Sequence, residues 1–269
     1  IDNLNPSDTN DLIGKYSQAD QVQLDRAIDA ARQAQQKWAL VGLEQRQSIL
    51  QAIGEELMAR SQELGELLSR EEGKPVNEGK GEVYRAGQFF TYYAAEVLRQ
   101  MGDLSDSVRP GVEVLVQREP VGVVAIISPW NFPTATAVWK IAPALAFGNA
   151  VIWKPANLVP ASAVAVAKII SRQTDKGLPK GLFNLLMGSG RTVGQRLVES
   201  SGIDAISFTG SLDVGKTIAA AAIDNLTKIQ MEMGSKNALV VMDDADMDTA
   251  VNCALNGAFG SSGQKCTAS

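Results

Sequence analysis

Apolar residues in the first hundred positions recur at the three- and four-residue spacing of a helix. The first stripe consists of Val22, Leu24, Ala27, Ile28, Ala31 and Trp38. The second consists of Ile49, Leu50, Ile53, Leu57, Leu64, Leu67 and Leu68, and the third of Val83, Phe90, Tyr93, Ala94 and Val97. Asp20, three residues before Gln23, resembles the capping box of a helix start. Residues 1–100 are therefore expected to form helices.

Two-residue alternation replaces the helical spacing between residues 101 and 119. A turn-like Pro110-Gly111 pair is followed by valines at every second position, namely Val112, Val114 and Val116. Alternation beside a turn predicts a β-hairpin over this range, and its half-apolar edge suits assembly with another chain.

From Val121 onward, short apolar runs alternate with helical patterns. The expected strands are residues 121–127, 149–153, 182–187, 204–208, 226–231 and 237–242. The expected helices include residues 160–173, 191–200 and 213–224. This alternation predicts an α/β fold with a mainly parallel sheet and helices on both of its faces.

Polar or glycine-rich loops directly follow five of the expected strands. They are Ser128-Pro129-Trp130-Asn131, Lys154-Pro155-Ala156-Asn157, Gly188-Ser189-Gly190, Thr209-Gly210-Ser211 and Glu232-Met233-Gly234. In open parallel sheets, the loops beyond the carboxyl ends of the strands line the ligand crevice. The sequence therefore predicts a ligand site along one edge of the sheet.

Composition and charge narrow the classes of function. The 269 residues suffice for one large or two ordinary domains. A net charge of −5 without a basic stripe argues against nucleic acid as a partner. No apolar run approaches the ~18–20 residues that span a bilayer, and the first residues lack the pattern of a signal peptide, so we expect a cytoplasmic protein.

The chain contains no histidine, which excludes Ser-His and Cys-His catalysis and histidine-ligated metals within it.

Residues 210–217 fit the P-loop pattern G-x-x-x-x-G-K-[ST], and the apolar run 239–243 ends in an aspartate as a Walker B strand would. A P-loop NTPase is therefore one alternative, although Asp213 would place a carboxylate against the phosphate. The other interpretation is a strand ending at Gly210 with a helix starting near Asp213. Backbone N–H groups at such a helix start favour an anion such as a dinucleotide pyrophosphate.

Several side chains have both a chemical and a purely structural interpretation. Cys266 lies in a small, polar neighbourhood beside Lys265, where a thiolate is a candidate nucleophile, whereas the apolar helical pattern around Cys253 indicates an inert buried thiol. Glu232 suits a general base or a surface carboxylate at a strand end, and Asn131 an oxyanion donor or a turn residue. The acidic run 243–248 resembles a metal loop, but capping of a helix N-terminus explains it more simply.

Taken together, these loops resemble the aldehyde dehydrogenase superfamily over nearly the whole chain. The resemblance is carried by Pro129-Trp130-Asn131-Phe132-Pro133, Trp153-Lys154-Pro155-Ala156, Phe208-Thr209-Gly210-Ser211, Met231-Glu232-Met233-Gly234 and Gly263-Gln264-Lys265-Cys266. It implies a Rossmann-like cofactor domain formed by residues 1–100 and 120–233. It also implies an oligomerisation hairpin at residues 101–119 and the beginning of an α/β catalytic domain at residues 234–269.

The resemblance also implies roles for individual residues. Cys266 would attack an aldehyde, Asn131 would hold the oxyanion and Glu232 would activate the water that hydrolyses the thioester. The residues expected at the dinucleotide are Ser128, Trp130, Lys154, Ala156, Asn157, Gly188, Phe208, Gly210, Ser211 and Gly234. Trp139 would lie near the substrate entrance, and no metal is implied.

Departures from the family pattern bear on cofactor and substrate. Asn157 stands where the family often has a glutamate that binds the adenine ribose, which favours NADP as well as NAD, with Lys154 as the counter-charge. The segments 231–237 and 264–268 look most like the α-ketoglutaric semialdehyde dehydrogenase branch, whose substrate is a carboxylate-bearing semialdehyde.

The chain is also shorter than the roughly 450–500 residues of the family. We therefore expect a fragment that is inactive by itself, from an enzyme that assembles as a homodimer or homotetramer. A CoA-acylating enzyme and a non-catalytic or truncated family member remain as alternatives.

Overall fold

The fold, given by a computed structural model that describes residues 1–99, 102–234 and 236–269, is built on a parallel sheet. Its five strands follow the order β7-β6-β5-β8-β9, and every neighbouring pair is parallel. The strands are β5 (Val123–Ile127), β6 (Ala150–Lys154), β7 (Phe183–Leu185), β8 (Ala205–Gly210) and β9 (Lys228–Met233). The α/β fold expected from the sequence is thereby confirmed.

The chain order of the strands reverses beside β5. From β5 the sheet grows through β6 to β7 on one side, and β8 then pairs with the other side of β5. The carboxyl ends of β5 and β8 therefore flank a topological switch point, which is where open α/β sheets bind ligands.

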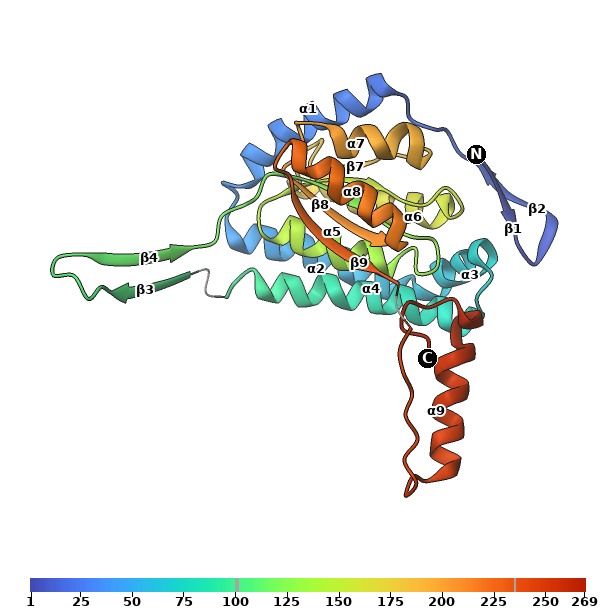
Figure 1. The fold of residues 1–269 in the computed structure, drawn as a ribbon. Coiled ribbons are helices and arrows are strands. Elements are labelled where there is room, and N and C mark those ends of the chain that lie inside the picture. The colour runs from blue at the N-terminus through green and yellow to red at the C-terminus, as the bar shows by residue number, and fades with distance from the viewer. Residues whose placement is uncertain (100–101, 235) are drawn as a thin grey trace.

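Helices cover both faces of the sheet (Figure 1). One face carries α1 (Gln21–Trp38) and α8 (Leu212–Asp224), with α7 (Gln195–Glu199) packed on α8. The other face carries α5 (Ala135–Ala146) and α6 (Pro160–Ser171), backed by α2 (Leu43–Ala59), α3 (Ser61–Glu72) and α4 (Val76–Glu96). Shorter helical turns lie at Arg172–Lys176, Gly190–Gly194 and Gly260–Gly263.

Most residues of the helical stripes of the first hundred positions pack into the main hydrophobic core, whereas Val22 is exposed. Trp38 and Phe90 are fully buried, as is Trp153 on the central strand β6. The capping box at the start of α1 is present, with Gln23 N–H donating to Asp20 and Asp20 N–H donating to Gln23. Burial of this apolar surface is the main force that holds the helices on the sheet.

Two expectations about secondary structure are wrong. The first residues form a hairpin of β1 (Asp2–Asn5) and β2 (Asp8–Lys15) rather than a helix, because Asn5 Oδ1 accepts from Ser7 N–H in the turn between the strands and β1 packs on α3. Residues 237–242 form no strand in the part of the chain that the structure describes. Their apolar side chains, such as Leu239 and Val240, are exposed, and no described strand lies alongside to complete a ladder.

The predicted hairpin of residues 101–119 is confirmed for its described part. Strands β3 (Gly102–Asp106) and β4 (Glu113–Gln117) pair antiparallel and project away from the body of the molecule (Figure 1). Helix α9 (Met247–Phe259) forms a second projection with the segments that flank it, and none of its residues is buried. None of the described helices has the length and hydropathy needed to cross a membrane.

Candidate active site and cofactor cleft

A cleft of about 710 Å³ opens at the switch point, beyond the carboxyl ends of β5 and β8. Seven of the ten residues expected at the dinucleotide line it, and they come from the carboxyl ends of β6 and β8 and from the loops after β5, β6 and β8. They are Ser128, Trp130, Lys154, Ala156, Phe208, Gly210 and Ser211. The other three, Asn157, Gly188 and Gly234, lie outside this lining.

Lys154 is the buried cation of the cleft. Its side chain extends from the end of β6 and donates to the carbonyl oxygen of Pro155 at 2.9 Å. Burial lowers the pKa of its ammonium to about 8. A Cβ at Gly194 would approach Lys154 Cε to 3.3 Å, so a larger residue there would crowd the lysine.

One buried hydroxyl in the cleft has no partner. Thr209 Oγ1 at the end of β8 makes no hydrogen bond within the part of the chain that is described. A buried polar atom left unsatisfied is costly, so it marks a position that a bound polar molecule would complete. The orphan hydroxyl, the buried cation and the start of α8 together fit a phosphate-bearing ligand.

Residues 210–217 do not form a P-loop. Strand β8 ends at Gly210 and helix α8 begins at Leu212, so Lys216 and Thr217 lie within the helix. The Thr217 hydroxyl donates to the carbonyl oxygen of Asp213, as helical residues do. The supposed Walker B segment is also not a strand, so the NTPase alternative loses both of its elements.

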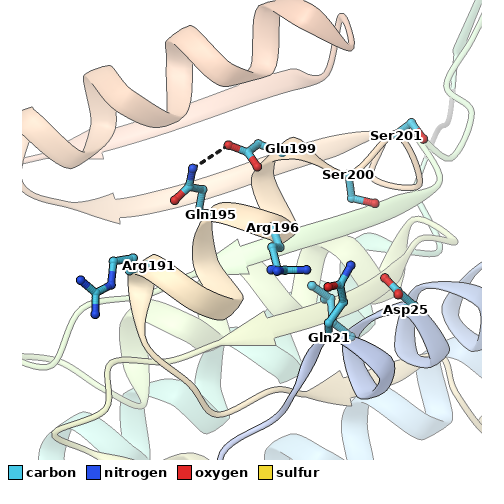
Figure 2. Close-up of a pocket in the computed structure, with 9 residues that line it drawn as sticks. Gln21, Asp25, Arg191, Gln195, Arg196, Glu199, Ser200 and Ser201 are labelled. Atoms are coloured by element: carbon cyan, nitrogen blue, oxygen red, sulfur yellow. Dashed lines mark hydrogen bonds between the residues drawn. The ribbon is translucent and has the colours of Figure 1, made fainter.

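Among the lining residues that sequence analysis did not single out, three have charged or amide side chains. Arg191, Gln195 and Glu199 project from the turn of Gly190–Gly194 and from α7 into both this cleft and a second hollow of about 610 Å³ beside α1. Figure 2 shows this hollow, in which Gln195 donates to Glu199 at 2.9 Å. The predicted helix of residues 191–200 contained all three, but only the tertiary fold shows which of its faces meets the cleft.

Asn131, one of the three expected catalytic residues, contacts the loop that carries a second, Cys266. Asn131 Nδ2, in the loop after β5, donates to the carbonyl oxygen of Gln264 at 2.8 Å. Gln264 lies two residues before Cys266, whose own carbonyl oxygen accepts from Asn237 at 3.4 Å. Cys266 is half-buried, so its thiol is partly accessible.

Glu232 is exposed near the end of β9. Among the described contacts, none joins its carboxylate to Asn131 or Cys266. Its charge acts on Lys140 of α5, a buried lysine that sequence analysis missed. Lys140 donates to Ser207 and Gln230 at 2.9 Å each, and burial lowers its pKa to about 8 although Glu232 raises it. The signal was a lone charge in an otherwise apolar helix, 135–146.

The remaining candidates have mixed outcomes. Trp139 is 37% exposed on α5 and packs edge-to-face on Phe89, so its place at a substrate entrance stays a prediction. Asp246 caps α9 by accepting from Thr249 N–H at 2.8 Å, which confirms the capping interpretation of the acidic run. The prediction that Cys253 is buried is wrong. Cys253 is exposed, because no described element covers the apolar face of α9.

Comparison with known proteins agrees with this geometry. The sequence model of the aldehyde dehydrogenase family matches residues 1–269. The chain belongs to the aldehyde dehydrogenase family. Among its relatives, alpha-ketoglutaric semialdehyde dehydrogenase of Bacillus subtilis is 42% identical over 264 residues, which are 98% of this chain and 54% of the relative. The 2,5-dioxopentanoate dehydrogenase of Saccharolobus solfataricus is 38% identical over 98% of this chain and 55% of its own.

Solved structures agree with the sequence comparison. Betaine aldehyde dehydrogenase of Staphylococcus aureus, crystallised with NAD+, superposes with a TM-score of 0.95 at 35% identity. The match covers 100% of this chain and 53% of that one. The chain therefore spans about half the length of the aldehyde dehydrogenases that it matches.

Proposed function

We propose that this protein oxidises an aldehyde to a carboxylic acid with NAD or NADP, through a covalent intermediate on Cys266. The observation that carries the proposal is the hydrogen bond between Asn131 and Gln264, which joins an amide donor to the loop of a half-buried cysteine. An amide donor and a thiol are the two groups, oxyanion donor and nucleophile, that acyl chemistry needs.

In the proposed reaction, the thiolate of Cys266 forms a carbon–sulfur bond with the aldehyde carbon. The N–H of Asn131 not used by Gln264 holds the resulting oxyanion. A dinucleotide held by the residues that line the cleft would supply the acceptor for the hydride that leaves the former aldehyde carbon, and a thioester to Cys266 would result. Glu232 takes a proton from the water that attacks this thioester, so the acid leaves and the thiol is restored.

The fit of the cleft to a dinucleotide rests on its own residues. Lys154 and Arg191 supply positive charge, Thr209 supplies an unpartnered hydroxyl, and Ser211 is the N-cap residue of α8. Asn157 carries no charge that would repel a 2′-phosphate, which supports the use of NADP beside NAD. A Michaelis constant for NADP far above that for NAD would contradict this part of the proposal.

For the substrate, we propose a carboxylate-bearing semialdehyde such as α-ketoglutaric semialdehyde. The support comes from the relatives, since three that bear this or an equivalent name are 37–42% identical over 98% of the chain. A betaine aldehyde dehydrogenase of Bacillus subtilis is also 42% identical, over 90% of the chain, so betaine aldehyde belongs in the substrate panel.

The proposed organisation has a cofactor domain of residues 1–100 and 120–233, a hairpin of residues 101–119 and a catalytic domain that begins at residue 234. Exposed apolar side chains on the hairpin, including Leu104, Leu115 and Val116, support its use in a homodimer or homotetramer. Sedimentation of the full-length protein tests this, since a monomer at micromolar concentration would contradict it.

Absorbance at 340 nm tests the activity directly. The full-length gene product and its Cys266→Ala variant would receive α-ketoglutaric semialdehyde with NAD and then with NADP. Reduction by the wild type alone supports the class, the nucleophile and the cofactor together. Equal rates from both would remove Cys266 from the mechanism. Acyl-CoA formation on addition of CoA would favour the acylating alternative over hydrolysis by Glu232.

A further inference from the structure

A buried cluster of charges lies between α3 and α4, outside the residues assigned above. The side chains of Glu72, Lys74 and Glu82 are each 2% exposed or less. Lys74 Nζ lies 2.7 Å from Glu82 Oε2 and 3.9 Å from Glu72 Oε2. Burial raises the pKa of both carboxyls against the opposing effect of Lys74. Because such charges lose their hydration, a cluster of this kind is weak evidence for a role in stability alone.

The cluster contacts the loop of the proposed oxyanion donor. Lys74 Nζ donates to the backbone carbonyl oxygen of Asn131 at 2.6 Å and lies 3.9 Å from the centre of the Phe132 ring. Glu82 Oε1 accepts from the N–H groups of Thr134 at 2.9 Å and Ala135 at 3.0 Å. One ion pair therefore fixes both ends of residues 131–135, which complete the connection from β5 and begin α5.

The same part of the chain also reaches the loop of the nucleophile. Glu78, in the first turn of α4, accepts from Ser261 N–H at 3.1 Å. Ser261 and Ser262 have positive φ angles of 55° and 56°, so this loop needs support to keep its shape. Residues 72–82 thus contact both loops that the Asn131–Gln264 hydrogen bond joins.

We propose that Lys74, paired with Glu82, is a positioning residue for the oxyanion donor. It holds the backbone of Asn131 while Gln264 holds one side-chain N–H, so the second N–H of the amide has a fixed direction. Lys74 does not line the cleft, and its proposed effect passes through the backbone of Asn131. The proposal rests on the proposed function, because it assigns Lys74 to the step that forms the oxyanion.

The first test replaces Lys74 by methionine in the full-length protein and measures hydride transfer by stopped flow at 340 nm. A displacement of about 1 Å in a reacting group costs ~10²-fold in rate, so we expect a loss of about that size. The dissociation constant of NAD, measured by fluorescence, should change by less than about threefold.

Arg46→Met is the matched control. Arg46 is likewise a buried cation that donates to backbone carbonyl oxygens, those of Trp38 at 2.9 Å and Ala39 at 2.7 Å, away from the cleft. Its loss should leave hydride transfer within about threefold of the wild-type rate. Equal rate losses in the two variants would overturn the proposal. If the Lys74→Met variant does not fold, the same measurement is made on the double variant Lys74→Met with Glu82→Gln, which removes both of the opposite charges.

A double-mutant cycle separates positioning from general damage. In an Asn131→Ala background the oxyanion donor is already absent, so adding Lys74→Met should cost less than about threefold in hydride transfer. A further hundredfold loss in that background would show that Lys74 acts by another route.

Amide hydrogen exchange supplies a readout that does not depend on activity. Lys74→Met should speed exchange at Thr134 and Ala135 at least about tenfold, while Arg46→Met should leave it unchanged. Unchanged exchange in Lys74→Met would overturn the proposal even if the rate falls. If the wild type oxidises no aldehyde, the proposed function fails and the role of Lys74 in the oxyanion step fails with it. Faster exchange in that case would show only that Lys74 holds residues 131–135.

Discussion

The affinity of the protein for its dinucleotide is expected to depend on pH through Lys154. This ammonium lines the cleft, and burial lowers its pKa to about 8, so the charge that attracts phosphate is lost as the pH rises through that value. If neutral lysine contributes nothing, the dissociation constant scales with 1 + 10^(pH − pKa). With a pKa of about 8, it should therefore rise about tenfold between pH 7 and pH 9. A charge-assisted hydrogen bond, at ~1.5–3 kcal/mol, is strong enough for that range.

The measurement is a fluorescence titration of the full-length protein with NADP and NAD between pH 6.5 and 9.5, using quenching of tryptophan because Trp130 lines the cleft. Lys154→Met should bind more weakly and lose the pH dependence. Lys140→Met is the matched control, since Lys140 has a similarly lowered pKa but lies outside the cleft. A wild-type affinity that stays constant from pH 7 to 9, or an equal dependence of the dissociation constant on pH in Lys154→Met, would refute the assignment of this pH dependence to Lys154.

Three further outcomes are expected. Asn131→Ala should lower kcat about 10²–10³-fold with the Michaelis constant for NAD nearly unchanged, as steady-state kinetics at 340 nm would show. Trp38 is fully buried and its Nε1 donates to Leu145 O at 2.7 Å, so Trp38→Ala should cost about 3–5 kcal/mol of unfolding free energy in a urea titration. Asp20→Ala removes the capping box of α1 and should cost about 1 kcal/mol in the same assay, whereas no loss would contradict the cap.

Local sequence patterns predicted the features whose hydrogen bonds join residues that are close in sequence. The capping box at Asp20 and the antiparallel pairing of residues 102–117 involve near neighbours in sequence, so their signals survive in a short window. Residues 237–242 show the limit of such signals. Their apolar pattern permits a strand, but a strand also needs a partner, and pairing is a property of the whole fold. At the start of the chain a strand was missed rather than wrongly predicted, because Asp2–Asn5 is too short and too polar to show a two-residue hydrophobic alternation.

The site residues likewise divide into those that the sequence predicted and those that depend on tertiary packing. Residues at the carboxyl ends of strands, such as Lys154 and Gly210, were predictable because these ends meet at one edge of a parallel sheet. Arg191 and Glu199 were not, since only packing decides which face of a helix meets the cleft. Lys74 was beyond sequence analysis altogether, because its contact with Asn131 spans 57 positions and leaves no periodic trace.

The folding of the projecting hairpin is expected to depend on the concentration of the protein. Strands β3 and β4 expose all their residues except Gly102 to at least a third of their surface, and an isolated two-stranded hairpin is at best marginally stable in water. If the hairpin docks on another copy, mass action ties its folding to association. Dilution would then loosen residues 102–117 while the parallel sheet stays intact, and a protease would find its first cleavage site there rather than in the body of the protein.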